Sequence, residues 1–176
     1  RRRTRTAIVD RAIEVLADRP DASLSVVAEA AEVSRSTLHR HFPGREHLIA
    51  AVDEAARTRF AEAFDRARPG DGDAVAALIR ISHELLAMGP VLGLVFNDNA
   101  VVDPDTWSDP SSPDGLSTVI RRGLDESSLD RGLRAEWIET TVWTLLFGAW
   151  LVLREGASTA DVAEQLSRTV EKAFRA

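Results

Sequence analysis

The chain has 176 residues, of which 44 % are hydrophobic and 28 % charged, and this apolar content supports a buried core rather than a disordered chain. It contains no Cys, which excludes a disulfide framework and a thiolate metal site, and its net charge is −6. The longest apolar run, residues 145–153, is shorter than the roughly 18 residues of a membrane span, so we expect a cytoplasmic protein without a membrane partner.

The predicted elements are all helices, because no alternation of apolar and polar residues is long enough to indicate a sheet. In the first part of the chain, the spacing predicts helices at about 6–18, 24–31, 34–42 and 45–68. Ser23 and Ser34 stand where N-caps are expected, and Pro43-Gly44 ends the third helix. After that, the spacing predicts helices at about 73–88, 90–97, 114–126, 134–155 and 159–175. The segment 97–115 is rich in Asp, Pro and Ser and is predicted to be a loop, within an all-α fold.

The second and third predicted helices are short and joined by a tight turn, which is typical of a helix-turn-helix. Ala28 is small where the two helices must cross, and Leu38 falls on the inner side. In such motifs the start of the second helix enters the major groove, where Arg pairs with guanine and hydroxyls contact bases or phosphates. The spacing leaves these residues on the outer side: Arg35, Ser36, Thr37, His39 and Arg40.

The charge is unevenly distributed along the chain. Residues 1–60 hold 11 Arg and 9 acidic residues, net +2, whereas residues 61–176 hold 11 basic and 19 acidic residues, net −8. A basic front on an acidic body favours a small nucleic-acid-binding module attached to something else. The four Arg among residues 1–5 either form an arm that enters a minor groove or are only a solubilising tail.

Between Thr6 and Ala56 the runs AIVDRAIEVLA, VSRSTL and RHFPGREHL follow one another in register without gaps. Over this stretch the chain resembles the DNA-binding domain of the TetR family of bacterial transcriptional repressors. The resemblance implies a three-helix DNA-binding domain at 1–50 and a helical ligand-binding and dimerisation domain at 51–176. The complete predicted DNA-binding set is Arg5, Ser23, Arg35, Ser36, Thr37, His39, Arg40, His41 and Arg45.

Four residues depart from the family pattern. Glu32 stands where Gly is common in the turn, and it needs an unusual φ or a different turn. Ser36 replaces a frequent Gly, His39 replaces a Tyr that touches phosphate, and Arg45 replaces a Lys while keeping its charge and phosphate-facing position. These departures leave open an alternative, a helical small-molecule-binding or scaffold protein whose front module does not read DNA.

Metal, cofactor and catalytic motifs are not predicted. His39 and His41 are two residues apart, so they point to different faces of a helix and do not suit zinc. The Asp-rich segment 97–115 lacks the order of a calcium loop. Because no nucleophile elbow, phosphate loop or paired-carboxylate pattern is present, we do not expect an enzyme.

The last two predicted helices suit a dimer interface. Small or slim residues recur along 134–155, and apolar residues recur at helical spacing along 159–175. The resemblance implies that these helices join two protomers in a four-helix interface, although they could instead close the core of one chain. The predicted interface residues are Thr144, Gly148, Val152, Leu166 and Val170.

Aromatic and apolar residues of the second domain are candidates for an effector pocket. The resemblance implies a small-molecule-responsive repressor, with the helix at 45–68 as the lever between effector and palindromic operator DNA. An apolar cavity with few polar groups suits a small apolar or aromatic effector, although such residues often form only core. The predicted pocket residues are His83, Met88, Leu92, Phe96, Trp107, Trp143, Phe147 and Trp150.

Overall fold

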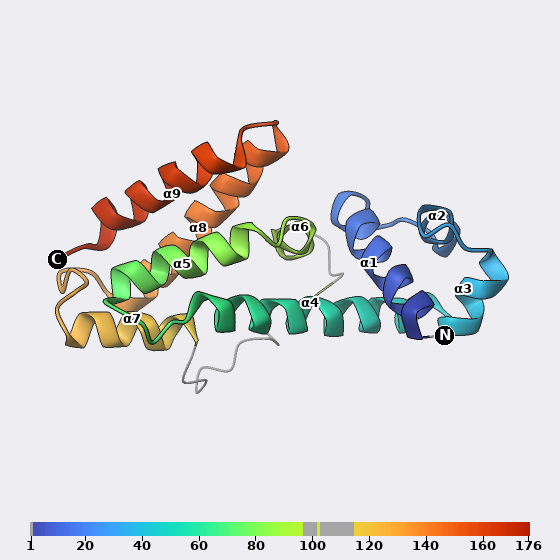
Figure 1. The fold of residues 1–176 in the computed structure, drawn as a ribbon, viewed down its shortest axis with the longest axis horizontal. Coiled ribbons are helices and arrows are strands. Elements are labelled where there is room, and N and C mark those ends of the chain that lie inside the picture. Colours follow the sequence, from blue (N-terminus) through green and yellow to red (C-terminus); the bar gives the residue numbers. More distant parts are fainter. Residues whose placement is uncertain (1, 97–101, 103–114) are drawn as a thin grey trace. The chain divides into compact units, whose positions relative to one another are not determined.

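The computed structural model describes residues 2–96, 102 and 115–176, and these residues form helices joined by short connections (Figure 1). The helices are α1 (Arg2–Asp18), α2 (Leu24–Ala30), α3 (Arg35–His41), α4 (Arg45–Ala67), α5 (Ala74–Leu86), α6 (Pro90–Phe96), α7 (Leu116–Asp125), α8 (Ala135–Arg154) and α9 (Thr159–Phe174). The predicted all-α fold and the order of its helices are confirmed. One bound differs clearly, because α1 begins at Arg2 rather than Thr6. Arg2, Arg3 and Arg5 therefore belong to a helix and not to an extended arm.

The predicted N-caps are confirmed at both short helices. The Ser23 hydroxyl accepts a hydrogen bond from the Val26 amide at 3.4 Å, and the Ser34 hydroxyl accepts one from the Thr37 amide at 3.1 Å. Each bond satisfies an amide that has no partner inside its own helix. The starts of α2 and α3 are therefore fixed by local sequence.

The turn between α2 and α3 contains the strained backbone that Glu32 was expected to need. Glu32 has a φ of 54°, in the left-handed region. Around it, the Glu32 amide donates to the Glu29 carbonyl and the Val33 amide to the Ala28 carbonyl, both at 3.0 Å. These two bonds form a Schellman cap, which normally places Gly at the left-handed position. The helix-turn-helix therefore keeps its turn, with a Glu in the strained position.

The chain forms two compact units, and the boundary between them lies inside α4, between Arg59 and Phe60. Unit 1 comprises residues 1–59 and 90–107, and unit 2 comprises residues 60–89 and 108–176. The predicted domain boundary after residue 50 also falls inside α4 and stays a prediction.

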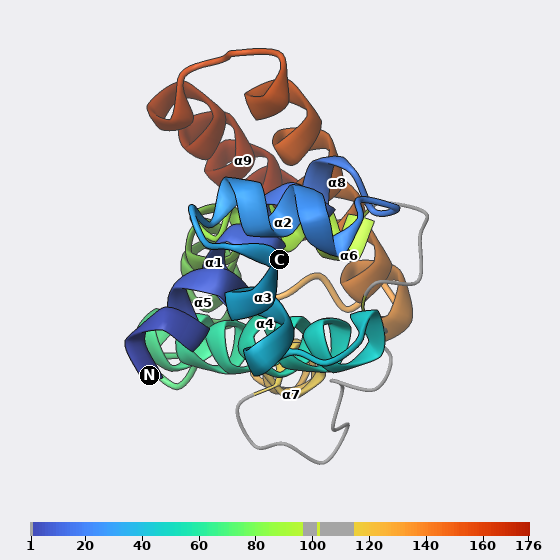
Figure 2. The ribbon, with the colours of Figure 1, turned by 90° about the vertical axis from the view of Figure 1, so that its right-hand side faces the viewer.

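In unit 1, α1 contacts both α2 and α6, and α2 contacts α3. In Figure 2, α2 and α3 are turned toward the viewer. An ion pair between Asp10 of α1 and Arg59 of α4 joins these two helices. The buried side chains of this unit include Ile8, Ile13, Leu16, Val27, Leu38, Phe42, Leu48, Val52, Leu92 and Leu94. This core holds the helix-turn-helix in place.

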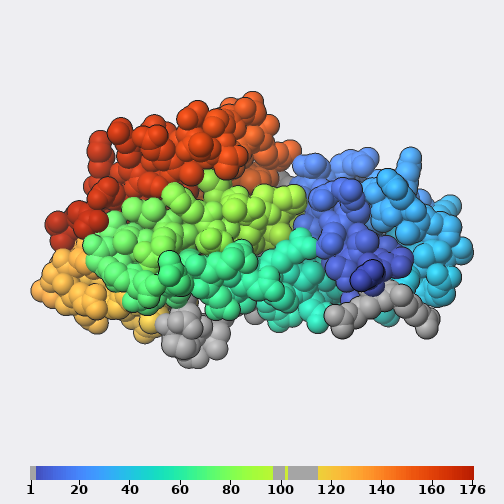
Figure 3. Space-filling view, in the orientation of Figure 1, coloured from blue at the N-terminus to red at the C-terminus, as the bar shows by residue number. Residues whose placement is uncertain are grey.

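In unit 2, α5 contacts α7, α8 and α9, and α8 lies antiparallel beside α9 (Figure 1). The start of α5 and α7 approach closely at Gly123, where an added Cβ would lie 2.4 Å from the Ala74 Cβ, so only Gly fits there. In the space-filling view α9, in red, lies at the surface along its length (Figure 3). Its inner side chains are buried, namely Val162, Leu166, Val170 and Phe174.

The longest apolar run of the sequence lies within α8, whose Leu146 and Trp150 are buried. No single helix of the described residues is long and apolar enough to cross a membrane. Within this described part of the chain, α5 and α6 reach the required length and apolarity when taken together, but they are bent by 99° at the break between them.

Candidate functional site

The first turn of α3 is organised by hydroxyl groups. The Ser34 hydroxyl donates to the Thr37 hydroxyl at 2.9 Å and lies 3.0 Å from the Ser36 hydroxyl. Thr37 and Ser36 are thus already held by the N-cap residue of their own helix. This network fixes the directions of the polar side chains at the start of α3, where a recognition helix meets base edges.

The outer face of α3 is polar and exposed, as the spacing predicts. Arg35, His39 and Arg40 are exposed, whereas Leu38 and Phe42 are buried below them. Among the described residues, none accepts a hydrogen bond from the Arg35, His39 or Arg40 side chain or pairs with its charge. Two guanidinium groups and an imidazole therefore remain available to an external acceptor such as DNA. Of the other predicted DNA contacts, Ser36 and Ser23 are exposed and His41 is half-buried.

The Arg45 side chain, predicted to contact DNA, forms hydrogen bonds with the protein itself. Its Nη1 donates to the Ala22 carbonyl and its Nη2 donates to the Pro20 carbonyl, both in the turn between α1 and α2. A guanidinium occupied in this way is directed at the protein, which conflicts with the predicted phosphate contact. The difference arises because the sequence pattern does not reveal where backbone carbonyls lie.

Arg5 also contacts the protein. Its guanidinium lies over the Phe42 ring, 5.2 Å from the ring centroid, which is within the range of a cation–π contact. Phe42 is the C-cap residue of α3 and is 1 % exposed. Arg5 therefore contacts the end of the helix-turn-helix from α1, and it does not lie on the free arm that the sequence suggested.

Aromatic side chains of α8 and the end of α4 meet within unit 2. The Trp143 ring stacks on the Phe60 ring with centroids 5.8 Å apart and an interplanar angle of 19°, and Phe60 lies 5.5 Å from Phe64. Phe147 and Trp150 form a second stacked pair, with centroids 5.9 Å apart. Sequence analysis did not single out Phe60 and Phe64, although their i, i+4 spacing on one predicted helix was an available signal.

The remaining predicted pocket residues are divided between the units. His83 is exposed, and its Nε2 lies 2.7 Å from the Ser167 hydroxyl and 3.2 Å from the Ala163 carbonyl. It therefore links α5 to α9, and its predicted place in an effector pocket stays a prediction. Leu92 is buried in unit 1, Phe96 is half-buried there, and Met88 is half-buried in unit 2. Trp107 lies outside the described residues.

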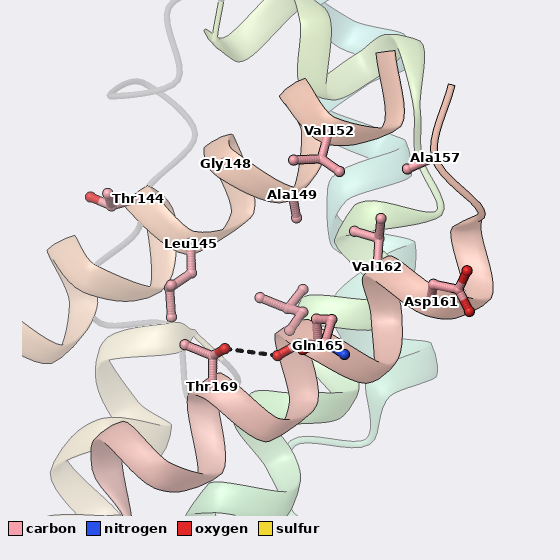
Figure 4. Close-up of a pocket in the computed structure, with 11 residues that line it drawn as sticks. Thr144, Leu145, Gly148, Ala149, Val152, Ala157, Asp161, Val162, Gln165 and Thr169 are labelled. Atoms are coloured by element: carbon pink, nitrogen blue, oxygen red, sulfur yellow. Dashed lines mark hydrogen bonds between the residues drawn. The ribbon is translucent and has the colours of Figure 1, made fainter. Parts of the chain in front are cut away.

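A groove of about 440 Å³ runs between α8 and α9 (Figure 4). Four of the predicted interface residues line it, namely Thr144, Gly148, Val152 and Leu166. The fifth, Val170, is fully buried, so it faces the core of its own chain and is removed from the set. Spacing alone predicted one apolar stripe along α9, but it could not show that α5 and α8 cover part of that stripe.

The threonine hydroxyls of the groove are satisfied within their own helices, while the side chains of Asp161 and Gln165 also line it. The Thr144 hydroxyl donates to the Thr140 carbonyl and the Thr169 hydroxyl to the Gln165 carbonyl, both at 2.8 Å, the latter bond being drawn in Figure 4. A Cβ added at Gly148 would meet no atom within 4 Å, so this helix surface is open. Beside the groove, α8 exposes large apolar side chains, including Leu151 at 41 % and Val152 at 45 %. Such a surface is typical of a contact with another protein surface.

Comparison with known proteins agrees with this architecture. Residues 8–52 match the family model of bacterial regulatory proteins of the tetR family. Over 169 residues the chain is 30 % identical to the HTH-type transcriptional repressor LfrR of Mycolicibacterium smegmatis, a match that covers 94 % of this chain and 87 % of LfrR.

Solved structures give the same result over nearly the whole chain. LfrR from Mycobacterium smegmatis in complex with proflavine is 29 % identical, with a TM-score of 0.74 and coverage of 97 % of this chain and 95 % of that one. The ketosteroid transcriptional regulator KstR2 of Mycobacterium tuberculosis is 11 % identical and shares the fold, with a TM-score of 0.75 and coverage of 98 % and 95 %. The chain belongs to the TetR family of bacterial regulatory proteins and is a transcriptional regulator rather than an enzyme.

Proposed function

We propose that the protein is a homodimeric repressor that binds palindromic operator DNA through α3 and releases it when a small aromatic effector binds. The observation that carries the proposal is the outer face of α3. There the side chains of Arg35, His39 and Arg40 are exposed and form no hydrogen bond or ion pair with the described residues. Two such helices, one from each protomer, read half-sites about 34–36 Å apart on one face of DNA.

Binding to DNA fragments that flank the gene tests the first part of the proposal. We expect the logarithm of the binding constant to fall steeply with the logarithm of salt concentration, because phosphate contacts release counterions. Arg35→Ala and Arg40→Ala should each weaken operator binding by about tenfold, as expected for loss of a base or phosphate contact. Arg57→Ala is the matched control, since Arg57 is an exposed Arg of α4 that pairs with Asp53 of the same helix.

A folded protein that binds none of these fragments at low salt would contradict the proposal. It would favour the alternative of a helical ligand-binding protein that does not read DNA. Equal affinity of the wild type and both α3 variants would instead show that another surface contacts the DNA.

The groove between α8 and α9 supports the homodimer. A twofold contact brings the same surface of each protomer together, so an open and mostly apolar surface on two adjacent helices suits a four-helix interface. We propose that Thr144, Gly148 and Val152 face the partner, while the buried Leu166 lines the groove beneath them. Their polar atoms are either satisfied within their own helices or absent, so covering them carries little desolvation cost.

The stacked rings of unit 2 support a flat aromatic effector. The structure of LfrR, which is 29 % identical to this chain, holds proflavine, a molecule with a planar aromatic ring system. We propose that such a molecule stacks on Trp143 and displaces the Phe60 ring, which belongs to α4. Because α4 begins directly after the helix-turn-helix, its movement would carry the change to the DNA-binding residues.

Proflavine titration tests the effector site. Stacking should quench tryptophan fluorescence, and Trp143→Leu should weaken proflavine binding at least about tenfold, because a flat ring loses its stacking partner. Trp137→Leu is the control, since Trp137 is on the same helix but 59 % exposed. Equal proflavine affinity in both variants would exclude Trp143 as the contact.

A further inference from the structure

We propose that Arg45 is a positioning residue that fastens the start of α4 to the turn between α1 and α2, and so fixes the recognition helix, rather than a residue that contacts DNA phosphate. The proposal rests on the proposed DNA binding for its functional part. Its structural part stands on two hydrogen bonds, from Nη1 to the Ala22 carbonyl and from Nη2 to the Pro20 carbonyl.

The two bonds close a ring of chain around the helix-turn-helix. The backbone leaves the turn at Ala22, passes through α2 and α3, and returns to the same turn at Arg45, so the bonds join residues 23 and 25 positions apart. Only Phe42, Pro43 and Gly44 separate the end of α3 from Arg45. Because Phe42 is buried and α2 begins at the Ser23 cap, both ends of the ring are held. The bonds therefore restrict the position that α3 can take relative to α1.

The chemistry of these bonds requires an arginine. The planar guanidinium presents parallel N–H groups that can donate to two acceptors at once, whereas a lysine ammonium is a compact point charge on a flexible stem. The two acceptors are the carbonyls of Pro20 and Ala22, in the tight turn between α1 and α2. Arg45, the first residue of α4, is half-buried. A Lys at this position keeps the charge, but it loses the fork that holds both carbonyls.

Arg5 supports the same arrangement from α1. Its guanidinium lies over the ring of Phe42, 5.2 Å from the centroid, at the other end of the three-residue connection that leads to Arg45. The connection from α3 to α4 is thus contacted by α1 at Phe42 and is bonded to the turn after α1 at Arg45. Two arginines next to the proposed DNA-reading face are therefore engaged with the protein itself.

The substitutions Arg45→Lys and Arg45→Ala separate positioning from phosphate contact. The matched control is Arg57→Lys, the same exchange at an exposed site of the same helix. Thermal unfolding, hydrogen–deuterium exchange of a peptide covering residues 19–34, and operator binding over a range of salt concentrations are measured for each variant. Thermal unfolding and exchange do not depend on DNA binding.

We expect Arg45→Lys to lower Tm by about 2–4 °C and to speed amide exchange at residues 19–34, because one of two charge-assisted hydrogen bonds is lost. Arg57→Lys should leave both unchanged. Operator affinity should fall about tenfold in both Arg45 variants, while the slope of log affinity against log salt stays that of the wild type.

Two results would overturn the proposal. The first is an Arg45→Lys variant with the Tm, exchange and operator affinity of the wild type. The second is an Arg45→Ala variant in which the slope of log affinity against log salt becomes shallower by about 1 for each protomer. Such a change is expected when a phosphate contact is lost. If the wild type binds no operator, the proposed function fails, and Tm and exchange still decide whether Arg45 holds the turn.

Discussion

Glu32 holds a backbone position that a residue with a side chain adopts only at a cost. Its φ of 54° places the Cβ close to the backbone carbonyl, a conformation that costs roughly 1–2 kcal/mol for residues other than Gly. The end of α8 provides the comparison, because Gly156 takes the same position there at a φ of 95°, with the Ala157 amide donating to the Val152 carbonyl at 3.3 Å. The helix-turn-helix therefore stores strain that the end of α8 avoids.

Replacing Glu32 with Gly should stabilise the protein. We expect Glu32→Gly to raise the free energy of unfolding by about 0.5–1 kcal/mol, the strain relieved less the extra chain entropy of Gly in the unfolded state. Chemical denaturation measures the change, and Glu32→Ala is the control, because Ala keeps the Cβ and the strain. An equal gain in both variants would show that loss of the Glu charge, and not relief of strain, is the cause.

The start of α5 is held by its own cap residue, Asp73, and by a side chain from the end of α9. Its carboxylate accepts a hydrogen bond from the Ala76 amide at 2.8 Å and lies 3.2 Å from the Arg175 guanidinium, so it caps α5 and pairs with the residue that follows α9. The Ala76 amide first, and then Arg175, lower the pKa of Asp73 below its ordinary value.

The lowered pKa of Asp73 makes part of the stability depend on pH. A carboxyl group with a lower pKa in the folded state stabilises the fold fully above its unfolded pKa of about 3.9, and this contribution is lost as pH falls through the folded value. We therefore expect Asp73→Asn to have a lower Tm than the wild type at pH 6, and the difference to shrink as the pH is lowered toward 2. A difference that is constant over this range would exclude the charge of Asp73 as its origin.

The helices were predictable because their signals are local. Ser23 and Ser34 precede apolar spacing and cap their helices as predicted, and the Glu32 conformation followed from the family pattern of the turn. The faces of the helices were predictable as well, and buried Leu38 lies beneath exposed Arg35 as the spacing required. These features depend on residues within a few positions of one another.

Contacts between distant helices were not predictable. Val170 shares an apolar stripe with Leu166, but whether its own chain or a partner covers that stripe depends on helix packing, and its own chain covers Val170. His83 meets Ser167, 84 positions away, and Arg45 meets carbonyl groups that every residue possesses. The spacing along one helix does not show which distant group a side chain will meet, so each residue was assigned to a ligand or to DNA by its chemistry alone.

The protein as a whole should depend on the groove between α8 and α9 for assembly. Gly148 lies in this groove, and an added Cβ meets no atom of its own chain, so Gly148→Glu fits the monomer but places a carboxylate in the proposed interface. We expect this variant to be a folded monomer by sedimentation and circular dichroism at concentrations where the wild type is a dimer.

The control for this variant is Gly70→Glu, which adds the same charge where the chain likewise leaves open space. It should leave the mass of the assembly unchanged. A Gly148→Glu protein that keeps the wild-type mass would move the dimer interface away from this groove.

The proposed DNA-reading face and the proposed dimer groove lie in different units of the chain, and this has a genetic consequence. Arg35 and Arg40 belong to unit 1, whereas Gly148 and Leu166 belong to unit 2. In the proposed homodimer, an allele damaged only in α3 would still produce a protomer with an intact groove, and that protomer would pair with an undamaged one. With equal expression and random pairing, three of every four dimers then carry at least one defective half. Loss of the reading residues should therefore be dominant over the wild-type allele, whereas loss of the groove should be recessive.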